Sequence, residues 1–206
     1  MNTTRDDLQI SAFFDRCAEK RLMQEFEPSE RETLNGFLLD WGISPGNRIL
    51  EPGCGSGRLT EVLAEAVGPA GEIYAMDLSP AMIELARERG LPDHVHFDCG
   101  SAASIPREAA CFDFVICLNV FPHFADKAAI LREFARVLNP SGQLWVNHFS
   151  SREELNHFHL HAGEEVAHHM LPCADDMSAM MIAAGFRTVD LNEGSDFYSL
   201  RAARCP

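Results

Sequence analysis

The chain has 206 residues, 46% of them hydrophobic and 23% charged, and a formal net charge of −14 at pH 7. A chain of this length can bury a full hydrophobic core as one domain. Its negative charge opposes binding to nucleic acid or to an anionic membrane surface, and no cluster of Lys and Arg offsets that charge. We therefore expect a small-molecule or protein partner, with no nucleic acid and no membrane.

Apolar runs, the N-terminal sequence and the cysteine spacing predict the cellular compartment. No apolar run approaches the roughly 20 residues that span a bilayer, and the first ten residues lack the basic start and apolar stretch of a secretory signal. The seven cysteines show no paired or CxxC spacing, which favours free thiols in a reducing environment. We expect a cytoplasmic protein, and the sequence does not indicate an oligomeric state.

The first half of the chain predicts helices followed by alternating strands and helices. Residues 8–40 have amphipathic helical spacing within an N-terminal helical segment, 1–44. Apolar runs then predict strands at 48–53, 72–77 and 95–100. A helical stripe occupies 59–67, and Ser79 followed by Pro80 predicts the start of a helix that runs to about Gly90.

The second half continues the alternation. Strands are expected at 112–119 and 143–150, with a helix between them that ends at the sequence NPSG. A polar, His-rich segment, a helix at 175–184 and a closing hairpin follow. This pattern predicts an α/β protein with a Rossmann-like open sheet, mostly parallel with an antiparallel C-terminal strand. We expect helices on both faces, an N-terminal helical lid, and a single domain over 1–206 whose sheet-based core is 45–206.

A glycine-rich turn follows the first predicted strand. Gly53, Gly55 and Gly57 occupy alternate positions, and Glu51 precedes them. A dinucleotide fingerprint, G-x-G-x-x-G, needs Gly or Ala where Arg58 lies. The pattern E-x-G-x-G-x-G instead resembles the first motif of the class I S-adenosylmethionine-dependent methyltransferases.

Further residues carry the same resemblance, which extends over roughly residues 45–145 and is similar to the ubiquinone/menaquinone-type branch. Asp77 closes the second strand, about twenty residues after the turn, where the family has its ribose-binding acid. The block from FDFVIC to VLNPSG matches the fourth strand, the following helix and the fifth strand. The resemblance implies an enzyme that uses S-adenosylmethionine as methyl donor.

The resemblance also implies a donor site. Asp77 would accept hydrogen bonds from both ribose hydroxyls. Leu78 and Met82 offer apolar surface to adenine or belong to the core. Ser101 lies where many relatives have an adenine-binding acid. The cofactor-binding residues expected are Glu51, Gly53, Gly55, Gly57, Asp77, Leu78, Met82, Ser101, Ala102 and Asn119.

The acceptor side is less determined. The loop NVFPHF after the fourth strand lacks the N-P-P-Y/F sequence of amino-methyltransferases that act on bases or glutamine. His123 in this loop is a candidate base or a packed loop histidine. His148 ends a parallel strand, where open α/β sheets bind ligands. We expect His123 and His148 to be catalytic toward a small molecule, such as a hydrophobic, quinone-like ring.

The segment 147–172 holds six of the nine histidines. His157 and His161 are one helical turn apart, and His168 follows seven positions later, a spacing that could place three imidazoles on one helix face. This pattern predicts a divalent metal site, with acceptor contacts or a polar cover as alternatives. The rival functions are therefore a metal-dependent methyltransferase and a non-catalytic S-adenosylmethionine-binding protein.

Overall fold

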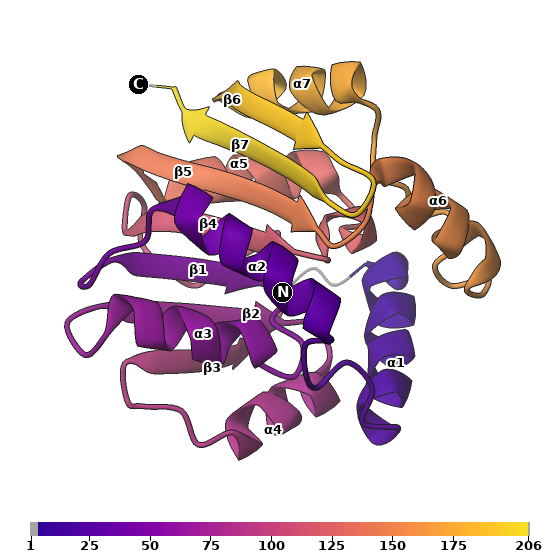
Figure 1. Ribbon diagram of the computed structural model, residues 1–206, viewed down its shortest axis with the longest axis horizontal. Coiled ribbons are helices and arrows are strands. Elements are labelled where there is room, and N and C mark those ends of the chain that lie inside the picture. The colour runs from indigo at the N-terminus through magenta and orange to yellow at the C-terminus, as the bar shows by residue number, and fades with distance from the viewer. Residues whose placement is uncertain (1–3, 206) are drawn as a thin grey trace. The chain divides into compact units, whose positions relative to one another are not determined.

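The computed structural model (Figure 1) describes residues 4–205. The chain divides into two compact units, Met1–Ala102 and Ala103–Pro206. Unit 1 contains three parallel strands in the order β3-β2-β1. They are β1 (Arg48–Pro52), β2 (Glu72–Asp77) and β3 (Val95–Cys99). Its helices are α1 (Arg5–Glu19), α2 (Pro28–Trp41), α3 (Arg58–Val67) and α4 (Pro80–Glu88).

Local sequence explains these elements. Four of the five residues of β1 are buried, as expected of a parallel strand covered on both faces. Helix α3 buries Leu59, Leu63 and Val67 along one stripe. Helix α4 begins where the sequence predicts, because the Ser79 hydroxyl accepts a hydrogen bond from the Met82 amide at 3.0 Å and Pro80 occupies the first turn.

Unit 2 contains four strands in the order β4-β5-β7-β6. Strands β4 and β5 are parallel, whereas β5–β7 and β7–β6 are antiparallel. The strands are β4 (Phe112–Leu118), β5 (Leu138–His148), β6 (Phe186–Glu193) and β7 (Tyr198–Arg204). The helices are η1 (Phe121–His123), α5 (Lys127–Val137), α6 (Arg152–His161) and α7 (Ala174–Ala183).

Two details of unit 2 correct the sequence-based prediction. Strand β5 begins at Leu138 rather than at residue 143, so the NPSG sequence belongs to the strand. The register between β4 and β5 shifts at this point, and the Asn139 amide donates to the Asp113 carboxylate at 2.6 Å, so tertiary pairing overrides the turn propensity. The closing hairpin is confirmed, and it contributes two antiparallel strands. Among residues 4–205, no helix is long and apolar enough to cross a membrane.

Candidate functional site

The glycine turn between β1 and α3 has a backbone that side chains would strain. Gly53, Gly55 and Gly57 have φ angles of 73°, 54° and 77°, in the left-handed region that glycine adopts at low cost. The amides of Gly53 and Cys54 donate to the Met76 carbonyl at 2.7 and 3.0 Å. The turn is therefore fixed against β2.

Asp77, the last residue of β2, links this turn to α4. One carboxylate oxygen accepts from the Gly55 amide and the other from the Ser79 amide, each at 2.9 Å. Burial raises the pKa of Asp77, the two amide donors oppose that rise, and the nearby Asp15 carboxylate adds to it. The side chain is half-buried, so it can accept further hydrogen bonds.

Glu51 lies beneath the turn and is only 3% exposed. Its carboxylate accepts from the Thr60 hydroxyl at 2.7 Å. Burial raises the pKa of Glu51 to about 8, and the Asp77 carboxylate adds to the shift. A cation bound nearby would favour the ionised form of this acid.

The remaining donor-site candidates of unit 1 follow β2 and β3. Met82 is buried with Cys17 and Ala18 of α1, which supports its assignment to the core. Leu78 and Ser101 are half-buried, and Ala102 is buried. The Gly100 amide donates to the Asp77 carbonyl at 2.9 Å, so the loop that holds Ser101 begins beside Asp77.

Helix α1 docks on the residues that follow Asp77. The Asp15 carboxylate accepts from the Ser79 hydroxyl at 2.6 Å and from the Ala81 amide at 3.3 Å. The Ser11 hydroxyl donates to the Leu78 carbonyl at 3.0 Å. The helix expected to form a lid is thus attached to the start of α4.

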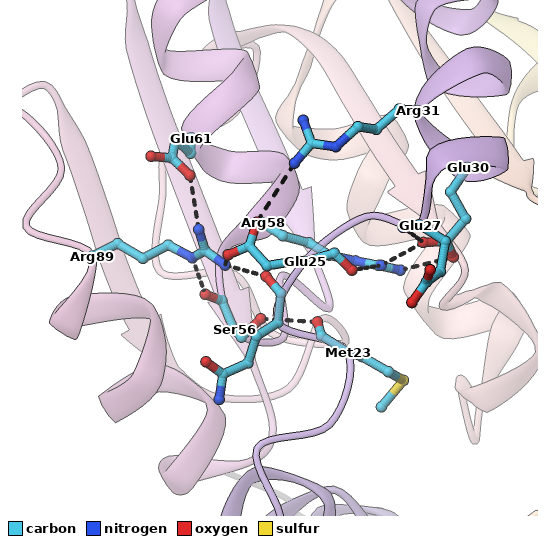
Figure 2. Close-up of polar contacts among 10 residues, drawn as sticks. Met23, Glu25, Glu27, Glu30, Arg31, Ser56, Arg58, Glu61 and Arg89 are labelled. Carbon is cyan, nitrogen blue, oxygen red and sulfur yellow. Dashed lines mark hydrogen bonds and ion pairs between the residues drawn. The ribbon is translucent and has the colours of Figure 1, made fainter.

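Figure 2 shows a second attachment, between the segment 20–27 and the glycine turn. The Ser56 hydroxyl donates to the Met23 carbonyl at 3.1 Å, and the Arg89 guanidinium donates to the Ser56 carbonyl at 2.7 Å. Arg89 also donates to the Gln24 carbonyl and pairs with Glu61 at 2.7 Å.

Arg58 makes a parallel set of contacts in the same region (Figure 2). It donates to the Glu25 carbonyl at 3.0 Å and pairs with Glu30 at 2.8 Å. The side chains of Arg58 and Glu30 are 15% and 22% exposed, so this pair is better shielded from solvent than an ordinary surface ion pair. Two arginines therefore fasten the 20–27 segment to the turn.

Histidines gather in unit 2. Nδ1 of His123, in η1, lies 3.1 Å from Nδ1 of His169, and the rings of His123 and His159 are 4.9 Å apart between centroids. Burial lowers the pKa of His123 well below its ordinary value, and the imidazoles of His159, His169 and His148 act in the same direction. The ring of His123 is therefore neutral at pH 7.

Two further predicted residues lie at the ends of β4 and β5. Asn119 has a φ angle of 55°; its amide donates to the Asn147 carbonyl at 2.9 Å, and its side-chain oxygen accepts from the Phe149 amide at 3.2 Å. Asn119 thus joins the ends of the two strands. His148 is fully buried, and burial lowers its pKa to about 3.

Comparison with known proteins identifies similar sequences and folds. A family model for the methyltransferase domain matches residues 50–146. The ubiquinone/menaquinone biosynthesis C-methyltransferase UbiE of Ectopseudomonas mendocina (strain ymp) is 35% identical over 113 residues, which cover 53% of this chain and 44% of that protein. The middle part of the chain therefore matches the methyltransferase domain family, and it is similar to S-adenosylmethionine-dependent enzymes of that family over about half of its length.

Other relatives agree with this family. A ubiquinone biosynthesis O-methyltransferase of Xanthomonas oryzae pv. oryzae (strain PXO99A) is 35% identical over 105 residues, covering 50% of this chain and 43% of that protein. The aligned regions span less than half the length of both of these curated relatives.

Solved structures confirm the predicted fold class of this chain. An S-adenosylmethionine-dependent methyltransferase from Aquifex aeolicus aligns with a TM-score of 0.68 and 21% identity over 86% of this chain and 98% of that one. Phosphoethanolamine N-methyltransferase 2 from Haemonchus contortus, solved with S-adenosylhomocysteine, aligns with a TM-score of 0.76 and 15% identity over 98% of this chain and 60% of that one. The predicted Rossmann-like fold, mostly parallel with antiparallel C-terminal pairing, is confirmed.

The metal site predicted from the histidine spacing is not supported. Helix α6 ends at His161, whose Nδ1 lies 2.8 Å from the His157 carbonyl of the same helix. Gly163, with a φ of 131°, turns the chain, so exposed His168 does not continue the helix face. Within 4–205, no group of three or more His, Cys, Asp or Glu side chains is placed to hold a metal ion.

The sequence patterns did not indicate two sets of residues that the structure brings together. His159 and His169 approach His123 from separate elements, and no spacing along one helix could indicate that approach. Arg58 and Arg89 fasten the 20–27 segment through backbone carbonyls, which carry no sequence signature. Only the excess of histidine in 147–172 pointed toward this part of unit 2.

Proposed function

We propose that this chain transfers a methyl group from S-adenosylmethionine to a small-molecule acceptor. The observation that carries the proposal is the Asp77 carboxylate, which holds the Gly55 and Ser79 amides and remains half-exposed. A carboxylate in this position suits a pair of ribose hydroxyls, because charge-assisted hydrogen bonds are the stronger kind. Residues 50–146 match the methyltransferase domain model, and a relative named as a methyltransferase is 35% identical over 113 residues.

In the proposed reaction, a lone pair of the acceptor attacks the methyl carbon, the carbon–sulfur bond breaks with its electron pair going to sulfur, and a protonated acceptor releases its proton to solvent. The positive sulfonium becomes the neutral thioether of S-adenosylhomocysteine. Because the sulfonium is a good leaving group, positioning and exclusion of water supply much of the rate. Asp77 would fix the ribose, and the Gly53–Gly57 turn would approach the donor with backbone alone.

Glu51 would serve the cationic end of the donor. Because its pKa is raised to about 8, Glu51 is protonated in most molecules of the unliganded protein near neutral pH. The positive charge of the donor would favour the carboxylate and release that proton. Binding of the donor would therefore become tighter as the pH rises toward 8.

The acceptor is proposed to be a largely apolar, ring-containing molecule that contacts His123 and His148 in unit 2. Two curated relatives are named for quinone biosynthesis, one as a C-methyltransferase and one as an O-methyltransferase. The low pKa of His148 makes it a hydrogen-bond partner rather than a strong base at neutral pH.

The test combines donor binding with transfer. We expect saturable binding of S-adenosylhomocysteine in calorimetry, and transfer of tritium from methyl-labelled S-adenosylmethionine to a hydroquinone or catechol ring. Failure of S-adenosylhomocysteine to bind would overturn the proposed function. Binding followed by transfer only to non-aromatic acceptors would overturn the proposed acceptor class.

A further inference from the structure

Two buried polar side chains lie opposite each other in unit 2. His148 ends β5 and Tyr198 begins β7, and the antiparallel register pairs these two residues. Each is only 1% exposed. Their ring centroids are 6.2 Å apart, and residues paired in this way project from the same face of a sheet.

Neither side chain is satisfied by the protein. Within the described residues, both ring nitrogens of His148 and the hydroxyl oxygen of Tyr198 are buried without a hydrogen-bond partner. Buried polar groups of this kind are rare in folded proteins, because each loses its bonds to water without replacement. Three such atoms on two facing residues indicate a place where another molecule supplies the bonds.

Other buried polar side chains differ in whether the protein pairs them: Trp145 Nε1 and Arg201 Nε, of the same two strands, also lack a partner within the described residues, whereas the following two groups are paired. The other tyrosine, Tyr74, is also 1% exposed, but its hydroxyl donates to the Asp98 carboxylate at 2.5 Å. One register position away from His148, the Asn147 amide donates to the Ser199 hydroxyl at 2.9 Å. The other buried tyrosine and the adjacent register pair are thus satisfied by the protein, whereas every polar side-chain atom of both His148 and Tyr198 is buried without a partner among residues 4–205.

We propose that His148 and Tyr198 bind a hydroxyl group of the methyl acceptor. The Tyr198 hydroxyl would donate to the acceptor oxygen, and one nitrogen of His148 would accept the hydrogen bond from the acceptor hydroxyl. The proposal rests on the proposed function and adds a residue, Tyr198, and a chemical class of ligand to it.

The charge state of His148 and Tyr198 indicates the chemical class of the ligand. Burial lowers the pKa of His148 and raises that of Tyr198, so both are neutral at pH 7. A positive charge on His159 would lower the pKa of His148 further. Burial lowers the pKa of His159 as well. A neutral pair buried in this way suits a neutral phenol or enol hydroxyl, because a carboxylate or an ammonium group would remain an unpaired buried charge.

A spectroscopic experiment tests the site without requiring turnover. The chain contains only two tyrosines, so protein labelled with 3-fluorotyrosine should give two fluorine resonances, assigned with Y198F. Catechol, which carries neutral ring hydroxyls, is titrated with and without saturating S-adenosylhomocysteine. We expect the Tyr198 resonance to shift saturably while that of Tyr74 stays in place. A Tyr198 resonance that stays fixed up to the solubility limit of catechol overturns the proposal.

Variants give the second arm. Y198F should bind catechol about tenfold more weakly than the native chain, because one hydrogen bond is lost, and H148L should be weakened similarly. Y74F is the matched control, and it should keep the native catechol affinity. Equal catechol affinity in the native chain and Y198F overturns the proposal. A native chain that binds no catechol, so that only water occupies the space between His148 and Tyr198, overturns it as well.

The two proposals fail separately. Calorimetry with S-adenosylhomocysteine reports the donor site in unit 1, and Y198F should leave that affinity unchanged. Loss of S-adenosylhomocysteine binding in the native chain would contradict the proposed function. Normal S-adenosylhomocysteine binding, together with a Tyr198 fluorine resonance that does not shift with catechol, would contradict only the proposal that His148 and Tyr198 bind the acceptor.

Discussion

The Asp77 carboxylate accepts a hydrogen bond at 2.9 Å from the backbone amide of Gly55, a residue 22 positions earlier in the chain. The two residues meet because β1 and β2 are parallel neighbours whose carboxyl ends share one edge. The glycine turn follows β1 and the acid ends β2, so the sheet brings the two motifs together. The separation of the motifs along the chain is therefore a consequence of one strand–helix–strand unit.

Gly57 should tolerate alanine less well than Gly55. Both have positive φ, which costs an alanine about 1–2 kcal/mol. A Cβ at Gly57 would lie 3.1 Å from the Ala86 Cβ, whereas a Cβ at Gly55 would have no neighbour within 4 Å. We expect G57A to lose about 1 kcal/mol more unfolding free energy than G55A in urea titrations. Equal losses of unfolding free energy in G57A and G55A would contradict this prediction and show that α4 moves at Ala86 without cost.

E51Q should change the pH dependence of stability. Burial raises the pKa of Glu51 from 4.5 to about 8, so between these values the folded chain keeps a proton that the unfolded chain has lost. Stability attributable to this group therefore falls as the pH rises through that window. Glutamine has no proton to lose, and its amide oxygen can still accept from Thr60.

We expect the unfolding free energy of E51Q, measured in urea, to increase relative to the native chain by a few kcal/mol between about pH 5 and pH 8. Above that range the difference should become constant. A difference between E51Q and the native chain that is independent of pH would contradict the raised pKa of Glu51.

H148L should flatten the acid side of the stability profile. Burial lowers the pKa of His148 from 6.5 to about 3, so below pH 6.5 the unfolded chain binds a proton that the folded chain does not. Stability attributable to His148 is present above pH 6.5 and is lost as the pH falls. Relative to H148L, the native chain should lose up to about 1.4 kcal/mol per pH unit below 6.5.

Urea unfolding followed by circular dichroism at several pH values measures this slope. H157L, which changes an exposed histidine of α6, is the control and should retain the native slope. Parallel profiles for the native chain and H148L would mean that His148 is protonated in the folded protein.

R89A should release the 20–27 segment. Arg89 donates to the Ser56 carbonyl and pairs with Glu61, and its loss removes the guanidinium from both. We expect a loss of about 1–3 kcal/mol in unfolding free energy and faster tryptic cleavage after Lys20 and Arg21. R87A, which removes an exposed arginine bonded to the Phe97 carbonyl, should cleave at the native rate; equal rates in both variants would contradict the fastening role.

Much of the fold could be predicted from sequence because its signals are local. The strand expected at 72–77 is β2, and Ser79 followed by Pro80 marks the start of α4. These signals combine buried apolar runs with a helix cap. The start of β5 was missed because NPSG has strong turn propensity, and only the shifted pairing with β4 places it in a strand.

The candidate site likewise has features that the sequence predicted and features that it did not. The association of Asp77 with the glycine turn follows from sequence, because adjacent parallel strands dictate it. The metal prediction failed because the helix ends at His161 and the three histidines do not share a face. The pairing of His148 with Tyr198 depends on the register of a strand fifty positions away, which the sequence pattern does not contain.

Calorimetric titration with S-adenosylhomocysteine tests the central claim most directly. D77A should weaken binding by about 1.5–3 kcal/mol, because it removes charge-assisted hydrogen bonds to the ribose. D93A removes an exposed acid of the same unit and should bind as the native chain does. Unchanged affinity in D77A, or equal weakening in both variants, would contradict the account.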